Sequence, residues 1–412
     1  MRSSSLRALL AAAVVAGLVV PGASAASASG ANIRCVDDVG SYAGRCTTGH
    51  DSIQAAVNAA EPGDLVLIGP GTYSEEVVVG AGKDGITIRG TDRNDVHLEG
   101  DSQTDRYGFL ITARGVEVAN MTASGFTHTA FFWTGTAGYH GRYLTAYNNG
   151  IYGVYALGSS GPGLFEKSYA SGNPDAGFYI GECNPCDATI RDVDSVNNGL
   201  GYSGTNASGN LVIEDSRWIA NGAGILPNTL DSEKLPPQCC IVIRNNLIQG
   251  SGSNPDVPLR GINAAAFGMG IGLAGSMYTL VHGNQVFDSN RYGIVVFPFP
   301  HETPNVYRAA GNRVERNTVA DSGFYDLSLA AGSGDWNCFG GNTFATSDPP
   351  RIETLYGCEI QGGSLRNLPV SGGPVSTVEL VTGLVRYSGN DNWRDQPVPD
   401  EQETMPDPLA GF

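Results

Sequence analysis

One interval, 24 residues long, recurs along this chain and constrains its fold more than any other feature. Three sets of residues keep it: Asn149, Asn173, Asn197 and Asn221; Gly153, Gly177 and Gly201; and Phe131, Tyr155 and Tyr179. A period of about 20–50 residues is typical of solenoids and related repeat arrays. The adjacent asparagines at 148/149 and 197/198 leave room for a slip of one residue in this frame.

The repeat unit is made of strands and turns. It contains a strand with a polar stop, such as Ile190–Val193, and a glycine followed by alternating apolar residues, as in Gly153–Ala156. The 57 glycines and the low charged fraction of 16% suit short strands better than surface helices. We therefore predict an all-β fold, a single parallel β-helix of about 24 residues per rung over residues 64–346. Insertions interrupt the period at Leu226–Gln238 and Ser251–Met269.

A helix is expected before the first rung, within an N-terminal segment of residues 26–63. Asp51 is a suitable N-cap and Gln54 stands three residues on, as in a capping box. One apolar face follows at helical spacing: Ile53, Ala56, Val57 and Ala60. We expect this helix to cap the exposed edge of the first rung. Residues 347–388 are assigned to a C-terminal cap region, and the Pro-rich acidic residues 389–412 to a flexible tail.

The first 25 residues have the layout of a secretion signal. Arg2 and Arg7 precede the apolar run Leu9–Val20, and Ala23–Ala25 is a small-residue cleavage site. The alternative is a membrane anchor, but the apolar run falls short of the roughly 20 residues that span a bilayer. We expect a secreted, extracellular protein with no membrane span.

All eight cysteines follow that cleavage site: Cys35, Cys46, Cys183, Cys186, Cys239, Cys240, Cys338 and Cys358. An even number in an exported chain favours disulfides. Cys35–Cys46 and Cys338–Cys358 are the expected local pairs. The middle four allow Cys183–Cys186 with a vicinal bond, or a cross-link between the two clusters, which is sterically easier. The Cys-x-x-Cys spacing also suits zinc, but export favours oxidation and we predict no metal there.

The formal net charge of −17 limits the partners that the chain can bind. Such a surface repels phosphate backbones, which excludes nucleic acid as a partner. It also disfavours polyanionic substrates unless a basic cleft or bridging calcium compensates. We expect a monomer that requires no cofactor, with calcium as the one ion to consider.

Three motifs at the start of the domain resemble a known superfamily. The motifs are Ser52–Val57, Pro62-Gly63-Asp64-Leu65-Val66 and Gly69-Pro70-Gly71-Thr72-Tyr73. Together with the repeats they resemble the secreted bacterial pectate-lyase-like β-helix superfamily. The resemblance implies a right-handed β-helix capped by an N-terminal helix. Members include polysaccharide lyases, hydrolases, uronate epimerases and sugar-binding proteins, so the motifs report the fold and not the reaction.

The catalytic signatures of these relatives are mostly missing. Val281-His282-Gly283 is present without the Gly-His-Gly of polygalacturonase-like hydrolases, and the Trp-x-Asp-His block of pectate lyases is absent. Mannuronan epimerases carry Tyr-Gly-x-Asp-Pro-His-Glu. Here Tyr292-Gly293 and Pro300-His301-Glu302 are separated by other residues and the Asp is missing.

An aromatic ladder is the strongest candidate for ligand binding. Strand alternation sends Val154 inward and Tyr155 outward, and the same argument places Tyr179 and Phe131 outside. Trp133 lies two residues along the lowest of these strands. Sugar rings stack on such surfaces, which makes these four residues candidate substrate-binding groups. The alternative is a ladder whose rings stack on one another and only stabilise the sheet.

Three polar residues near this ladder are candidate catalytic groups. Glu182 and Asp187 flank the Cys183/Cys186 turn and could act as acid and base in glycoside hydrolysis, or bind calcium. His301 follows the segment Phe297–Pro300 and could be a general base. The simpler interpretation of all three is that they are solvated surface residues.

Three functions remain at this stage. The first is a secreted protein that binds an extracellular polysaccharide and cleaves or epimerises it, as a lyase, epimerase or glycoside hydrolase. The second is a non-catalytic structural or adhesion rod. The third, a metal-delivery accessory, is disfavoured because methionine is rare, with five residues, and the cysteines are expected to be oxidised.

Overall fold

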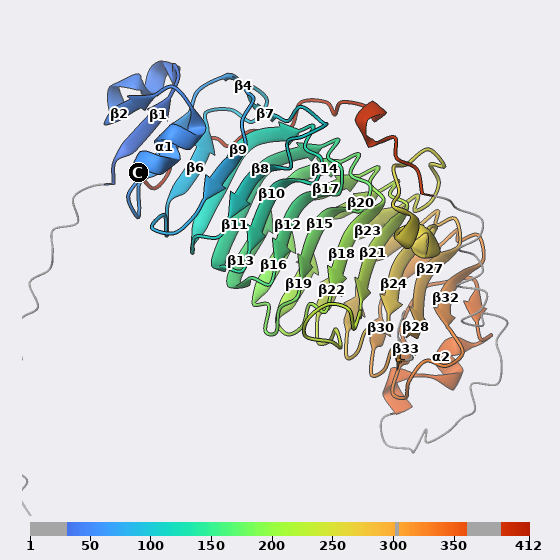
Figure 1. Ribbon diagram of the computed structural model, residues 1–412. Coiled ribbons are helices and arrows are strands. Elements are labelled where there is room, and N and C mark those ends of the chain that lie inside the picture. Colours follow the sequence, from blue (N-terminus) through green and yellow to red (C-terminus); the bar gives the residue numbers. More distant parts are fainter. Residues whose placement is uncertain (1–30, 301–304, 361–388) are drawn as a thin grey trace, which may run out of the picture.

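The computed structural model describes residues 31–300, 305–360 and 389–412. The predicted secretion signal (1–25), His301 and most of the predicted C-terminal cap region lie outside the described residues. Figure 1 shows one long coil of stacked strands, and the strands pair in parallel from turn to turn. This confirms the predicted all-β parallel β-helix.

One face of the coil is an eleven-stranded sheet, called the front sheet here, to which each turn contributes one strand. Its strands are β5 (Val77–Val79), β8 (Tyr107–Ile111), β10 (Thr129–Thr134), β12 (Tyr152–Leu157), β15 (Ala176–Gly181), β18 (Leu200–Thr205), β21 (Ala223–Asn228), β24 (Met269–Ala274), β27 (Tyr292–Phe297), β32 (Tyr325–Leu329) and β34 (Ser347–Asp348).

The other faces belong to a 21-stranded sheet. In most turns it receives two short strands separated by a residue with positive φ, such as Lys167, Asp192 or Asp215. Its strands are β1 (Ile33–Val36), β2 (Thr48–His50), β3 (Leu65–Ile68), β4 (Gly71–Tyr73), β6 (Thr87–Gly90), β7 (Val96–Glu99), β9 (Val116–Ser124), β11 (Ala137–Tyr147), β13 (Ser160–Glu166), β14 (Tyr169–Ser171), β16 (Ala188–Arg191), β17 (Asp194–Val196), β19 (Leu211–Glu214), β20 (Arg217–Ile219), β22 (Val242–Arg244), β23 (Leu247–Gln249), β25 (Leu280–His282), β26 (Gln285–Phe287), β30 (Arg313–Glu315), β31 (Thr318–Ala320) and β33 (Cys338–Gly340).

Asparagine side chains form a continuous hydrogen-bonded column inside one corner of the coil. The Oδ1 of Asn173 accepts from the backbone N–H of Asn149, that of Asn198 from Asn173, and that of Asn221 from Asn198. All four side chains are fully buried. The 24-residue frame therefore slips by one residue at Asn198. Asn197 has positive φ and its amide faces the C-terminal tail instead.

The predicted helix is present as α1 (Ile53–Ala59), and its Ile53, Ala56 and Val57 are buried as expected. Its N-cap is Ser52 and not Asp51, because the Ser52 Oγ accepts the Ala55 N–H at 3.1 Å. The helix contacts β1, β2, β3 and β5 at the N-terminal end of the coil (Figure 1). Its role as a cap stays a prediction.

Shorter helices and one hairpin complete the described part of the chain. They are α2 (Ile352–Leu355), the 3-10 helices η1 (Gly40–Arg45), η2 (Gly261–Ala266), η3 (Cys358–Ile360) and η5 (Trp393–Asp395), and the antiparallel pair β28 (Phe299–Pro300) and β29 (Val306–Tyr307). In the described ranges no helix has the length and apolar character needed to cross a bilayer.

The C-terminal tail differs from the flexible segment that its composition predicts. It returns along the coil so that the C-terminus lies beside α1 (Figure 1). Asn390 pairs with Leu259 through two backbone hydrogen bonds, and Arg89 donates to the Pro408 and Ala410 carbonyls. The tail buries three apolar side chains, those of Trp393, Met405 and Leu409. These contacts hold a sequence that is too polar to fold by itself.

All eight cysteines are paired. Cys35–Cys46 and Cys338–Cys358 form as predicted. The middle four adopt the local alternative, Cys183–Cys186 and the vicinal Cys239–Cys240. The cross-link that we considered sterically easier is therefore absent from these residues.

Candidate functional site

Three aromatic side chains stack on the outer surface of the front sheet. Phe132 pairs with Tyr155, and Tyr155 with Tyr179, in consecutive strands. We call these three residues the aromatic column. Phe131 and Trp133 were predicted to belong to this surface, but both are fully buried in the interior core. The step from Phe132 to Tyr155 is one residue shorter than the repeat, and that slip reverses which residues of β10 face outward.

The rings of the aromatic column cover one another. The Phe132 and Tyr155 rings are parallel within 10°, with centroids 4.5 Å apart, and Tyr179 meets Tyr155 edge-on at 4.7 Å. Only 3–7% of each residue is exposed. The aromatic column therefore has the geometry of a ladder whose rings stack on one another and stabilise the sheet. What it offers to a ligand is ring edges and hydroxyl groups, and the neighbouring rings of Tyr107 and Tyr152 are half-buried.

Two glutamates meet at the end of the aromatic column. The loop between β21 and β22 brings Glu233 to Tyr179, whose hydroxyl donates to the Glu233 Oε2 at 3.4 Å. Glu182 accepts the Lys234 N–H at 3.1 Å and forms an ion pair with the Lys234 Nζ at 3.5 Å. Burial and the charge of Glu182 raise the pKa of Glu233 to about 7, although the Tyr179 hydrogen bond opposes this shift. Near neutral pH, Glu233 therefore exists both as an acid and as a carboxylate.

The carboxylate that sequence reasoning paired with Glu182 lies elsewhere. Asp187 is exposed and accepts a hydrogen bond from Asn210 at 2.7 Å. Glu233 is the second carboxylate beside Glu182. The only signal in the sequence that could have indicated it is the interruption of the repeat at Leu226–Gln238. His301 lies outside the described residues, so its candidate role stays a prediction.

The opposite border of the aromatic column holds a buried acid and a neutral histidine. Asp175 accepts from Arg260 at 3.2 Å and from Asn263 at 3.1 Å. Burial raises the pKa of Asp175, against the charge of Arg260 and these hydrogen bonds. Burial and the charges of Arg106 and Arg260 lower the pKa of His128 to about 4. His128 is thus uncharged at neutral pH.

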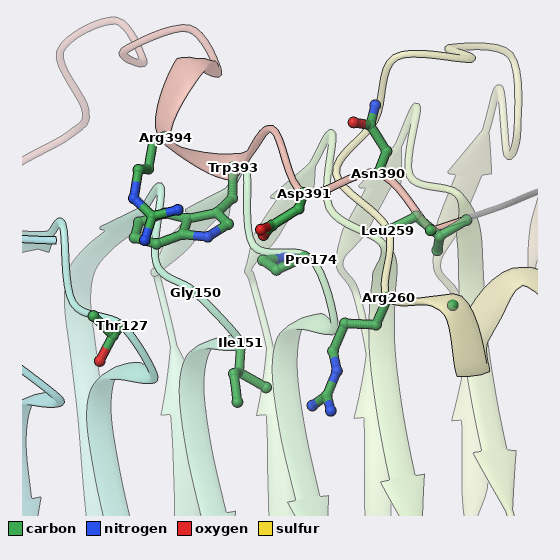
Figure 2. Close-up of a pocket in the computed structure, with 12 residues that line it drawn as sticks. Thr127, Gly150, Ile151, Pro174, Leu259, Arg260, Asn390, Asp391, Trp393 and Arg394 are labelled. Carbon is green, nitrogen blue, oxygen red and sulfur yellow. The ribbon is translucent and has the colours of Figure 1, made fainter. Parts of the chain in front are cut away.

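A pocket of about 440 Å³ adjoins this second border. Figure 2 shows it between the C-terminal tail and the turns that precede the front strands, with Arg260 extending below the tail and Arg394 lying against Trp393. The Arg394 guanidinium is 4.0 Å from the centre of the Trp393 ring. Arg260, which lines the pocket, also donates to Asp175 at the border of the aromatic column.

One cluster in the described ranges has the composition of a metal site: Glu315, Cys338 and Cys358. Its two sulfur atoms form a disulfide, so they are not thiolate ligands. This cluster gives no support to a metal centre.

Comparison with known proteins identifies the fold. The family model of the right-handed β-helix region matches residues 129–297. The mannuronan C-5 epimerase AlgE4 A-module of Azotobacter vinelandii superimposes with a TM-score of 0.55 at 16% identity, covering 72% of this chain and 91% of that one. A rhamnogalacturonan lyase gives a TM-score of 0.52 at 14% identity, covering 72% and 84%. No curated protein matches the chain by sequence.

These findings define the class: the chain is a right-handed parallel β-helix protein. They confirm the right-handed β-helix that the resemblance implies, and they assign no enzyme subfamily. At such low identity the similarity concerns the fold alone.

Proposed function

We propose that this protein is secreted and that it binds and hydrolyses an extracellular polysaccharide on the front sheet. The observation that carries the proposal is the Glu182–Glu233 pair at the end of the aromatic column. The pKa of Glu233 is raised to about 7, while Glu182 is held by the amide and ammonium groups of Lys234. Glycoside hydrolysis requires two carboxyl groups, one of which carries a proton near neutral pH, as Glu233 does.

In the proposed reaction, protonated Glu233 donates its proton to the glycosidic oxygen as the bond to the sugar carbon breaks. Glu182, as the carboxylate, accepts a proton from a water molecule whose oxygen forms the new bond to that sugar carbon. The hydroxyl edges of Tyr155 and Tyr179 orient the sugar beside the acid. The scheme requires no cofactor. The disulfides suit an oxidising compartment, and the two similar β-helix structures are named for enzymes of polysaccharide chemistry.

The test is a screen of residues 26–412 against neutral and acidic polysaccharides, with and without calcium, that measures reducing ends and unsaturated uronates. We expect reducing ends to appear without ultraviolet-absorbing uronates. Glu233→Gln should lower kcat at least 100-fold. Glu99→Gln, at an exposed glutamate of β7, is the matched control and should leave kcat unchanged. Full activity in the Glu233 variant, or silence across the screen, would contradict the proposal.

One observation favours a second function, a non-catalytic rod. The rings of the aromatic column bury almost all of their surface against one another. Rings that pack in this way stabilise the sheet without binding a ligand. A rod would bind no polysaccharide in the same screen, and replacing Tyr155 with Ala would change thermal stability only.

A further inference from the structure

Two exposed aromatic side chains, which do not belong to the aromatic column, lie at equivalent positions of one corner of the coil. Tyr278 is 59% exposed and Trp336 is 73% exposed, the highest values for aromatic residues in the described ranges. Tyr278 donates its N–H to the Ala310 carbonyl, and Gly311 donates to that of Asp335. Tyr278, Gly311 and Trp336 are therefore equivalent positions of three consecutive rungs.

The backbone at this column is one that bulky residues rarely adopt. The φ angles of Tyr278 and Trp336 are 49° and 69°, in the left-handed region. The equivalent residues of earlier rungs include Asp187 and Asn210, which tolerate this region well. A non-glycine residue there costs roughly 1–2 kcal/mol, and rings this exposed bury too little surface to offset that cost. Strain of this kind is typical of functional positions.

Glycine at position 311 shapes the surface between the two rings. A Cβ atom there would collide with the ring of Tyr278, so the ring lies against the Gly311 backbone. With rungs about 4.8 Å apart, the two aromatic positions are about 9.6 Å apart along the coil axis. A ligand that contacts both must be extended along that axis.

The preceding rung at this corner belongs to the loop that carries Glu233. The loop that carries Glu233 ends at Cys240, and the Cys240 N–H donates to the Met277 carbonyl. Cys240 therefore precedes Tyr278 by one rung in the same column. The exposed Asp335 beside Trp336 and the net charge of −17 disfavour an anionic ligand here.

We propose that Tyr278 and Trp336 form a stacking platform for an extended, uncharged polysaccharide, whose rings lie on the two aromatic faces. The platform holds the polymer next to the loop that bears Glu233. This last step rests on the proposed hydrolysis, whereas binding to the platform does not.

The test is affinity electrophoresis in gels containing hydroxyethyl cellulose, xyloglucan or galactomannan. At least one polymer should retard the wild type, and Tyr278→Asn and Trp336→Asn should each weaken binding about tenfold. Asparagine suits the left-handed backbone, so these variants should fold, and melting temperatures no lower than that of the wild type would show it. Phe324→Ala removes an aromatic residue that is 53% exposed at another place and should bind like the wild type.

Three results would overturn the platform: unchanged retardation of both asparagine variants, no retardation of the wild type by any of these polymers, or a dimer of the wild type that Trp336→Asn dissociates. The last would make this corner a contact between copies of the chain. Glu233→Gln should keep full binding. Platform-dependent binding without any turnover would contradict the proposed hydrolysis and leave the platform standing.

Discussion

At the scale of single residues, the raised pKa of Glu233 distinguishes the Glu182–Glu233 pair from the exposed carboxylates of this acidic chain. Glu233 accepts a hydrogen bond from Tyr179, and its pKa is raised by burial and by the charge of Glu182. Asp187 is much closer to Glu182 in sequence than Glu233 is, but it is exposed and accepts a hydrogen bond from Asn210. Chemistry of the acid–base kind follows from such differences in environment and not from residue type.

Glu233 should also make stability depend on pH. Its pKa in the folded chain is about 7, above that of an unfolded glutamate, so between these values the folded state binds more protons. Stability therefore falls as pH rises through that window. We expect Glu233→Gln to match the wild type at pH 5 and to melt about 2 °C higher at pH 8. Melting curves at both pH values check this, and an equal difference at both would contradict it.

Some residues could be placed from the sequence and others could not. The outward direction of Tyr155 and Tyr179 follows from strand alternation, and the structure agrees. Phe131 was misplaced because a step shorter by one residue is invisible to a fixed period, and a slip of one reverses the faces of a strand. Glu233 was missed because the path of an inserted loop depends on contacts such as that between Lys234 and Glu182, which no local pattern encodes.

At the scale of elements, the buried asparagine column joins four successive rungs. Asn198 accepts hydrogen bonds from the N–H and the side chain of Asn173, and donates to the carbonyls of Ala170 and Val196. The repeat could be recognised in the sequence because an asparagine side chain recurs at the same corner of these rungs, where it binds buried backbone groups.

Asn198→Ala should be strongly destabilising. The substitution leaves several buried groups without partners, each of which costs about 1–3 kcal/mol, and we expect the free energy of unfolding to fall by about 3 kcal/mol. Asn290→Ala is the control, because Asn290 is exposed and its replacement should change stability by less than about 0.5 kcal/mol. Denaturant titrations measure the free energy of unfolding of both variants. A loss in Asn198→Ala as small as that of the control would contradict the structural role of the asparagine column.

At the scale of the whole molecule, the C-terminal tail links the middle of the coil to its first rungs. Asn148 and Asn197 donate to Gln396, Asn120 accepts from Thr404 and Met405, and Arg45 donates to Phe412. Composition predicted flexibility because polar, Pro-rich segments cannot bury enough apolar surface alone. It could not show that the corner of the coil supplies the missing partners.

Removing residues 389–412 should therefore destabilise the coil. The deletion removes the buried side chains of Trp393, Met405 and Leu409, each of which contributes roughly 1.5–3 kcal/mol through its burial. The entropy that the tail loses when it packs on the coil offsets part of this contribution. We expect the free energy of unfolding to fall by about 3 kcal/mol. Val398→Ala, at a tail residue that is 71% exposed, should have no effect. Rapid proteolysis of the tail in the native wild type, with unchanged stability after deletion, would contradict this expectation.

The path of residues 389–412 also determines when the first rungs can be covered. The residues that cover Arg89 and contact Arg45 are synthesised after every rung of the coil, although the rungs that they cover are made first. The early rungs therefore wait for this tail before their corner is closed. A chain released too soon would carry a formed coil with one uncovered corner, and a tag fused after Phe412 would lie at the start of the coil rather than at its far end.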